Sequence, residues 1–235
     1  MLTPAPPVPL VVLLDVDNTL LDNDRFSSDL DTRLEQALGA EGRRAYRARY
    51  EALRTQRGYA DYLAPLQDLR QDFASDPDLL RLSAFLLDYP FAERLYPGAL
   101  AAIAHLQAIA MPVILSDGDV VFQPRKIQRA GLWDAVQGRV LVCVHKESRL
   151  DAVQAAYPAR HYAIVDDKPA LLASIKAQLG TRVTTVFVRQ GHYATAAPDP
   201  VLPPPDLSVA DIGALAAIDG HALLRGSAAS ARESA

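Results

Sequence analysis

Five short runs of apolar residues are spaced along the chain, each about as long as one buried β-strand. They lie at 10–14, 111–115, 140–144, 162–165 and 183–188. Segments whose apolar residues have helical spacing separate most of them, for example 98–110 and 169–179. Continuous apolar strands that alternate with helices indicate a parallel sheet covered on both faces. The pattern therefore predicts an α/β fold.

One long interval, 23–94, interrupts this alternation and contains no run that is typical of a strand. Its apolar residues recur three, four, seven or eight positions apart, which is the spacing of amphipathic helices. Examples are Leu34, Leu38, Tyr46, Tyr50 and Leu53. Because the interval is too long for a loop, we expect a small α-helical cap domain inserted after the first strand. Right-handed crossovers would place it over the C-terminal edge of the sheet, where such sheets bind ligands.

The remaining residues, 1–22 and 95–225, are expected to form the core domain around the sheet. Residues 197–205 contain five prolines and are interpreted as an extended connector, followed by a helix-like segment at 210–218. The last residues, 226–235, are small and polar. We expect a flexible C-terminal tail there.

The composition excludes several function classes. Of the 235 residues, 50% are apolar and 22% are charged, and the net charge is −4, as in ordinary soluble globular proteins. The single cysteine, Cys143, excludes a disulfide framework and a cysteine-based metal site. A nucleic-acid partner would require a clustered basic face, and a membrane span would require ~18 consecutive apolar residues. Neither is present, nor is a secretory signal, so we expect no nucleic-acid or membrane partner and a cytoplasmic location.

Two acidic residues, Asp15 and Asp17, follow the first predicted strand. Packing explains them poorly, because burying an unpaired carboxylate is costly. In a strand, residues i and i+2 face the same side, so both carboxylates could converge on one site. The alternative is an ordinary Asp/Asn turn at the end of a strand.

Three later predicted strands also end in polar residues. Ser116 and Asp117 follow the second run, Lys146 follows the third, and the pair Asp166 and Asp167 follows the fourth. In a parallel sheet these residues reach the same edge as the first strand end. Phosphoryl transfer requires such groups, namely a nucleophile, an acid/base, oxygen ligands for Mg²⁺ and donors for the phosphoryl oxygens. The set of strand ends therefore favours a phosphoryl-transfer site.

Taken in chain order, these motifs resemble those of the haloacid-dehalogenase superfamily. The matching positions are the segment 15–19 (DVDNT), then Ser116, Lys146 and the pair Asp166-Asp167. The segment 95–100 (LYPGAL) resembles the point where the chain re-enters the core after an inserted cap. The resemblance covers residues 8–22 and 95–215, and it implies a Rossmann-like core with a helical cap.

The resemblance implies a catalytic or binding role for each matched residue. Asp15 would attack phosphorus and become an aspartyl phosphate. Asp17 would protonate the leaving oxygen and then take a proton from the attacking water. Ser116 and the backbone N–H of Asp117 would bind phosphoryl oxygens, and Lys146 would neutralise charge on the phosphate and the nucleophile.

Mg²⁺ is the cofactor that the resemblance implies. Its ligands would be a carboxylate oxygen of Asp15, the backbone carbonyl of Asp17 and the last of the matched motifs, the pair Asp166-Asp167. Within that motif Asp167 is favoured as the direct ligand, with Asp166 nearby or bound through water. The motif continues as Lys-Pro and lacks the further acid that many members carry a few residues on.

Several neighbouring residues have competing interpretations. Lys126 is an alternative to Lys146 as the lysine of the matched motifs. It lies in a predicted helix, 121–130, rather than at a strand end. Asp119 is expected to cap that helix, with a substrate contact as the alternative. His145 is expected to be exposed or packed, and Lys168 to face solvent or a nearby carboxylate.

The sequence predicts a Mg²⁺-dependent phosphomonoester hydrolase acting on a small soluble phosphorylated metabolite. Dehalogenases of the superfamily attack carbon and need no acid two residues after the nucleophile, so Asp17 favours phosphate. A phosphomutase or phosphotransferase with the same core residues is an alternative, as is a non-catalytic phosphate-binding regulatory module. Sugar phosphates, nucleoside monophosphates and phosphoglycolate-like acids are all candidate substrates. The arginines between residues 43 and 57 would favour an acidic one, or serve only surface solubility.

Overall fold

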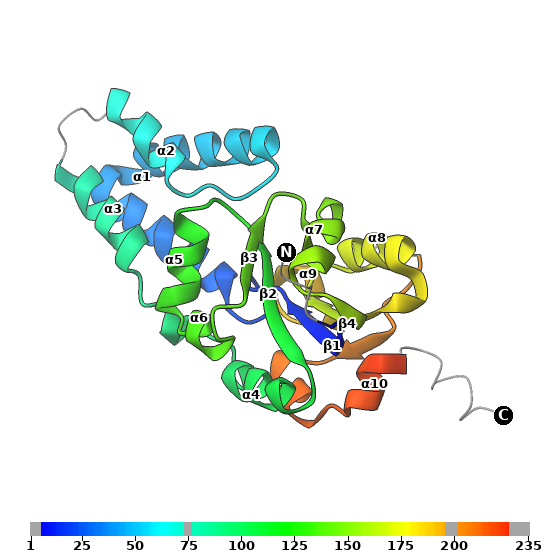
Figure 1. The fold of residues 1–235 in the computed structure, drawn as a ribbon. Coiled ribbons are helices and arrows are strands. Elements are labelled where there is room, and N and C mark those ends of the chain that lie inside the picture. Colours follow the sequence, from blue (N-terminus) through cyan, green and yellow to red (C-terminus); the bar gives the residue numbers. More distant parts are fainter. Residues whose placement is uncertain (1–5, 73–76, 196–201, 226–235) are drawn as a thin grey trace, which may run out of the picture.

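A parallel sheet of six strands, in the order β3-β2-β1-β4-β5-β6, forms the centre of the molecule (Figure 1). The computed structural model describes residues 6–72, 77–195 and 202–225. The strands are β1 (Val8–Leu14), β2 (Met111–Asp117), β3 (Val140–Cys143), β4 (Ala159–Asp166), β5 (Val183–Val188) and β6 (Leu207–Val209). The five predicted strands and their parallel arrangement are confirmed.

Helices cover both faces of this sheet. They are α4 (Ala99–Ile109), α5 (Phe122–Arg129), α6 (Leu132–Ala135), α7 (Leu150–Ala156), α8 (Pro169–Leu179), α9 (Gly191–Thr195) and α10 (Gly220–Arg225). Alternate residues of β1 separate the two layers: Leu10, Val12 and Leu14 share a core with α4, α5, α6 and α10. Val11 and Leu13 belong to a second core with α7 and α8. Because both faces of the strand are buried, its sequence is continuously apolar.

The interval between β1 and β2 is helical, as expected. It contains α1 (Asn23–Arg57), α2 (Ala64–Asp68), the 3₁₀ turn η1 (Leu69–Gln71), α3 (Pro77–Asp88) and the 3₁₀ turn η2 (Phe91–Arg94). These helices gather at one end of the molecule, at the upper left of Figure 1, with α5 of the core beside α3. That residues 23–94 form a separate cap domain stays a prediction.

Helix α1 reverses direction at Gly39, whose backbone has φ 69° and ψ 179°. The Nε atom of Arg47 lies 2.7 Å from Oδ1 of Asp31, and that of Arg43 lies 3.1 Å from Oε2 of Glu35. In a straight helix, residues 31 and 47 would be about 24 Å apart. The two halves of α1 therefore form an antiparallel hairpin, and a positive φ at its turn favours glycine.

The C-terminal part of the core differs in detail from the sequence prediction. Residues 207–209, which carried no strand prediction, form the edge strand β6 beside β5. The helix-like segment 210–218 contains the 3₁₀ helix η5 (Ile212–Ala217); two further 3₁₀ turns are η3 (Lys146–Ser148) and η4 (Gly180–Arg182). Most of the predicted connector, 197–201, and the predicted tail, 226–235, lie outside the described residues. Within the described ranges, no helix has the length and apolar character needed to cross a membrane.

Candidate active site

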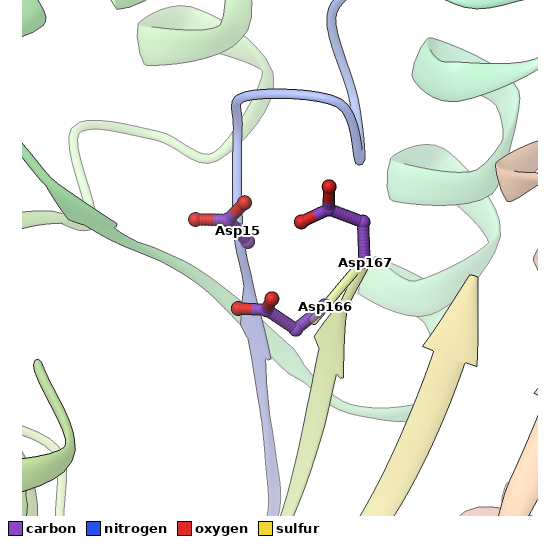
Figure 2. Close-up of side chains that lie close together, drawn as sticks. All are labelled: Asp15, Asp166 and Asp167. Carbon is purple, nitrogen blue, oxygen red and sulfur yellow. The ribbon is translucent and has the colours of Figure 1, made fainter. Parts of the chain in front are cut away.

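Three buried carboxylates meet where β1 and β4 end side by side (Figure 2). Asp15 directly follows β1, Asp166 is the last residue of β4, and Asp167 is the next residue. One carboxylate oxygen of each lies within 4.8 Å of the others. The chain turns to β2 on one side of β1 and to β4 on the other, so this is the switch point at which open α/β sheets bind ligands.

Lys146 is the counter-ion of this acidic cluster. It lies at the start of η3, after β3, and its Nζ atom is 2.6 Å from Asp15 Oδ1 and 2.6 Å from Asp166 Oδ2. Burial alone would lower the pKa of Lys146, but the charges of the two carboxylates outweigh it and raise that pKa above its usual value. The ammonium therefore stays protonated and balances part of the negative charge on the cluster.

Asp167 is the carboxylate that this network leaves without a partner. Asp166 Oδ1 accepts a hydrogen bond from the backbone N–H of Lys168 at 2.9 Å, and Oδ2 forms the ion pair with Lys146. Neither oxygen of Asp167 has a hydrogen-bond partner among the described residues, although both are buried. Burial, together with the charges of Asp15 and Asp166, raises the pKa of Asp167 to about 9. Closely spaced carboxylate oxygens, of which two lack partners, fit a hard divalent cation such as Mg²⁺.

The Asp17 side chain makes a different set of contacts. Its Oδ1 and Oδ2 atoms lie 2.8 and 3.0 Å from Nζ of Lys126, and Gln123 Nε2 lies 3.4 Å from Oδ2. Asp17 also lines the cleft that opens above the acidic cluster. The two rival lysines thus have separate partners, because Lys146 contacts Asp15 and Lys126 contacts Asp17.

Ser116 and Asp117 end strand β2 beside this site. Ser116 is buried, and its Oγ atom accepts a hydrogen bond from Gln123 Nε2 at 2.9 Å. The Asp117 carboxylate accepts one from the backbone N–H of Lys146 at 2.9 Å, and burial raises its pKa. The structure therefore brings the ends of β1, β2, β3 and β4 together, as the sequence predicts.

Gln123 is a site residue that the sequence analysis missed. It lies on α5 together with Lys126, three residues later, and both side chains are buried. Phe122 and Ile127 of the same helix are buried as well. The sequence does carry a signal for Gln123, because two polar residues lie on the buried face of a short amphipathic helix. Polar side chains in such a position require hydrogen-bond partners.

A cleft of about 270 Å³ lies between the acidic cluster and the helices that follow β1. Its core side carries Asp17, Asp117, Asp167, Lys168 and Tyr193, and its other side carries Arg47, Tyr50, Arg54, Tyr59 and Tyr62. Lys168 is held near carboxylates: although burial opposes it, the charges of Asp15 and Asp166 raise the pKa of this lysine. A volume this small suits a compact metabolite.

The weaker candidates have structural roles that their contacts explain. Asp119 Oδ1 accepts hydrogen bonds from the backbone N–H groups of Val121 and Phe122 at 2.8 and 2.7 Å, so it caps the start of α5 as predicted. The His145 ring lies against Gly58, where a Cβ atom would come within 2.3 Å of it. The ring touches the end of α1 on one side but stays exposed, at 59% of its side-chain surface.

Comparison with known proteins identifies relatives along most of the chain. The family model of the haloacid dehalogenase-like hydrolases matches residues 10–190. A protein of Burkholderia xenovorans LB400, assigned as a haloacid dehalogenase-like hydrolase, is 54% identical to this chain in a solved structure. The match covers 91% of this chain and 100% of that one, with a TM-score of 0.83. No functionally curated protein matches the chain.

More distant solved structures share the fold. The HAD-hydrolase YfnB of Bacillus subtilis, bound to magnesium, is 16% identical; 88% of this chain and 97% of that one are covered, with a TM-score of 0.58. The L-2-haloacid dehalogenase of Xanthobacter autotrophicus, with chloropropionic acid covalently bound, is 19% identical, with 88% and 96% covered and a TM-score of 0.52. Because the family model spans residues 10–190 and all the matched motifs, this chain belongs to the haloacid dehalogenase-like hydrolases.

Proposed function

We propose that this protein is a Mg²⁺-dependent phosphatase that hydrolyses phosphate monoesters of small metabolites through an aspartyl phosphate on Asp15. The observation that carries the proposal is the carboxylate of Asp17, two residues after Asp15 and at the edge of the cleft. Phosphate transfer needs a group that protonates the leaving oxygen, and halide displacement does not. Asp17 therefore favours phosphate esters over haloacids as substrates.

In the first step a carboxylate oxygen of Asp15 attacks phosphorus, and the bond from phosphorus to the leaving oxygen breaks. Asp17 donates its proton to that oxygen, so the product leaves as a neutral alcohol. Lys146, 2.6 Å from Asp15, holds the nucleophile in place and offsets charge on the phosphoryl group. Ser116 and the backbone N–H of Asp117 would donate hydrogen bonds to the phosphoryl oxygens.

In the second step water attacks the phosphorus of the aspartyl phosphate, and Asp17 takes the proton that the water loses. The bond from phosphorus to the Asp15 oxygen then breaks. Inorganic phosphate leaves, and the Asp15 carboxylate is restored. The proton that Asp17 gave to the alcohol is replaced by one from the water, so Asp17 ends the cycle protonated as it began.

Asp15, Asp167 and the backbone carbonyl of Asp17 would hold Mg²⁺, with Asp166 beside it. The support for Asp167 is that neither of its buried oxygens has a hydrogen-bond partner or an ion pair among the described residues, whereas Asp166 accepts a hydrogen bond from Lys168 and forms an ion pair with Lys146. When bound, the ion supplies positive charge that offsets the carboxylates and the phosphate. Lys146 then needs to neutralise only part of the negative charge of the phosphate and the Asp15 carboxylate when the two come together.

The contacts of the cleft favour a compact substrate with a second acidic group. Arg47 is committed to Asp31 and to Ser27, at 2.7 to 2.9 Å. Arg54 pairs only loosely, with Nη1 3.7 Å from Glu51 Oε2 and half of its side chain exposed. An exposed ion pair of this length contributes little. The guanidinium also hydrogen-bonds Tyr193, and its remaining donors could bind an anion at the far end of a substrate.

The test is release of inorganic phosphate from p-nitrophenyl phosphate and a panel of small phosphomonoesters, with Mg²⁺ and with EDTA. Chloride release from L-2-chloropropionate is measured in parallel. The proposal predicts metal-dependent phosphate release, abolished by Asp15→Asn without loss of the fold. Chloride release without phosphate release would overturn it in favour of a dehalogenase.

A further inference from the structure

Lys126 has more contacts with its surroundings than a helix lysine normally makes. Its side chain is fully buried, and the Nζ atom donates to both oxygens of Asp17 and to Oδ1 of Asn23, at 2.8, 3.0 and 3.0 Å. An ammonium group has three protons. The three acceptor atoms around Lys126 therefore match its full donor capacity.

The Nζ atom of Lys126 is also surrounded by aromatic rings. Ring centroids lie 5.5 to 5.7 Å from it, and they belong to Phe26, Tyr62, Phe91 and Phe122. Three of these residues come from the helical interval after β1, and one comes from α5 itself. At these distances the π faces attract a buried cation. The four rings therefore favour a charged side chain at position 126. Packing alone would not require a charge there, since methionine could fill the same volume.

The position of the ammonium determines where the Asp17 carboxylate lies. Both of its oxygens contact Lys126, so the carboxylate is held from one side, and Gln123 Nε2 lies between Asp17 Oδ2 and Ser116 Oγ at 3.4 and 2.9 Å. General acid–base catalysis requires the acid within about 2.6–3.2 Å of the oxygen that it protonates. With both oxygens in contact with Lys126, the Asp17 carboxylate has fewer orientations than one free to rotate.

Lys126 also connects Asp17 to the helical interval. Asn23 is the first residue of α1; its Nδ2 donates to the Tyr62 hydroxyl at 3.3 Å, and its backbone N–H donates to Asn18 Oδ1 at 3.1 Å. Moving Asn23 or Tyr62 away from α5 would remove a contact from the ammonium. The orientation of Asp17 thus depends on Asn23 and Tyr62, which belong to the helical interval.

We propose that Lys126 is a positioning residue, which holds Asp17 in the orientation for proton transfer while Asn23 and Tyr62 pack around its ammonium. This inference rests on the proposed phosphatase function. Among the described residues, the ammonium of Lys126 donates to Asp17 and Asn23 and not to Asp15, Asp166 or Asp167. It acts through Asp17, in a role separate from that of Lys146.

The test compares Lys126→Met with wild type on two classes of ester. Alkyl phosphates need a proton on the leaving oxygen, whereas p-nitrophenolate leaves without one. We expect kcat for an alkyl phosphate to fall about a hundredfold, with little change in KM and a much smaller fall for p-nitrophenyl phosphate. The kcat–pH profile of the alkyl phosphate should also change. Arg125→Met is the matched control, because this neighbour on α5 is 46% exposed and pairs with Asp88 at the surface.

A double-mutant cycle tests whether Lys126 acts through Asp17. In an Asp17→Asn background, Lys126→Met should add no further selective loss on alkyl phosphates. Equal losses on both ester classes in the single variant, or a rise in KM alone, would overturn the proposal. Should Lys126→Met fail to fold, Lys126→Gln, which keeps a polar end, is compared in the same way.

A crystal structure of the folded Lys126 variant separates this inference from the proposed function. We expect the Asp17 carboxylate to leave its present orientation; a carboxylate that stays in place would overturn the positioning role whatever the activity. If wild type released no phosphate from any ester, the proposed function would fail. The orientation of Asp17 in the variant would still decide whether Lys126 positions it.

Discussion

The Nζ atom of Lys146 lies 2.6 Å from Oδ1 of Asp15 and equally close to Oδ2 of Asp166, although the three residues come from different strand ends. All three side chains are almost completely buried. A charge this deep is tolerated only when it is paired. The same ion pairs therefore fix the side chain of the expected nucleophile and hold β1, β3 and β4 together at the edge where the cleft opens.

Replacing Lys146 with methionine should damage both activity and stability. Removing the donor should lower kcat about a hundredfold or more. Leaving two buried carboxylates without their counter-ion should lower the free energy of unfolding by about 3 kcal/mol. Urea unfolding and phosphate release measure the two effects, with the exposed Arg160→Met as the control. A variant as stable as wild type would show that the ion pairs contribute nothing to the fold.

The metal-free protein should lose stability as pH rises. The pKa of Asp167 in the folded protein is about 9, above the ~3.9 of an unfolded chain. The folded state therefore holds this proton more tightly, and that contribution, complete at acid pH, is lost as pH rises through about 9. Thermal unfolding in EDTA between pH 5 and pH 9 measures the slope.

Magnesium should reverse this trend, because it competes with the proton for the same carboxylate. We expect the increase in Tm on adding Mg²⁺ to grow with pH. Asp167→Asn removes the titrating group, so it should flatten the slope in EDTA and abolish most of the increase. An unchanged Mg²⁺ effect in that variant would exclude Asp167 as a direct ligand.

Arg54→Gln should change selectivity rather than catalysis. The exposed guanidinium lines the cleft opposite the acidic cluster, so we expect it to bind a second acidic group of the substrate. KM for phosphate esters that carry a carboxylate should rise about tenfold, as expected for one charge-assisted contact, while p-nitrophenyl phosphate is unaffected. Arg44→Gln, an exposed residue of the same helix, is the control. Equal KM changes for both ester types would contradict this role.

The edge strand β6 should depend on Asp206. Its Oδ2 atom accepts from Lys176 Nζ at 2.7 Å and from the backbone N–H of Thr185 at 2.9 Å. Burial works against it, but these donors, with the charge of Lys176, lower the pKa of Asp206 below its usual value. This stabilisation is complete above the unfolded pKa of ~3.9 and is lost as pH falls through the lower folded value.

Asp206→Asn should therefore lower the free energy of unfolding at pH 7 by about 1–3 kcal/mol, and by less at acid pH. Urea unfolding at pH 7 and near pH 3 measures the difference. Asp151→Asn, at an exposed position, is the control. A loss of stability that is the same at both pH values would contradict the role given to the carboxylate.

Much of the fold was readable from the sequence because β1 is buried on both faces and is continuously apolar. The same feature placed Asp15, Ser116, Lys146 and Asp166 at one edge, since parallel strands align their C-terminal ends. Strand β6 was missed because it has three residues and lies at the edge of the sheet. So short a strand is fixed by Asp206 and by its pairing with β5 rather than by its own pattern.

The contacts made by α5 could not be predicted from strand ends. Gln123 and Lys126 reach the site from a helix, and their partners Ser116 and Asp17 are at least seven residues away in the chain. Local sequence patterns can predict that a polar residue is buried. They do not predict which distant group forms a hydrogen bond with it. The pairing of Lys126 with Asp17 rather than Asp15 depends on tertiary packing, which brings the aromatic side chains of the helical interval around the ammonium.

The most direct test of this account is to trap the phosphorylated intermediate. Asp17→Asn keeps the nucleophile but lacks the base for the second step, so it should accumulate the aspartyl phosphate on mixing with p-nitrophenyl phosphate and Mg²⁺. Rapid acid quenching followed by peptide mass spectrometry locates the added phosphoryl group. The account predicts that group on Asp15, with none in Asp15→Asn. A phosphoryl group on another residue, or Asp15 esterified by L-2-chloropropionate and never phosphorylated, would contradict it.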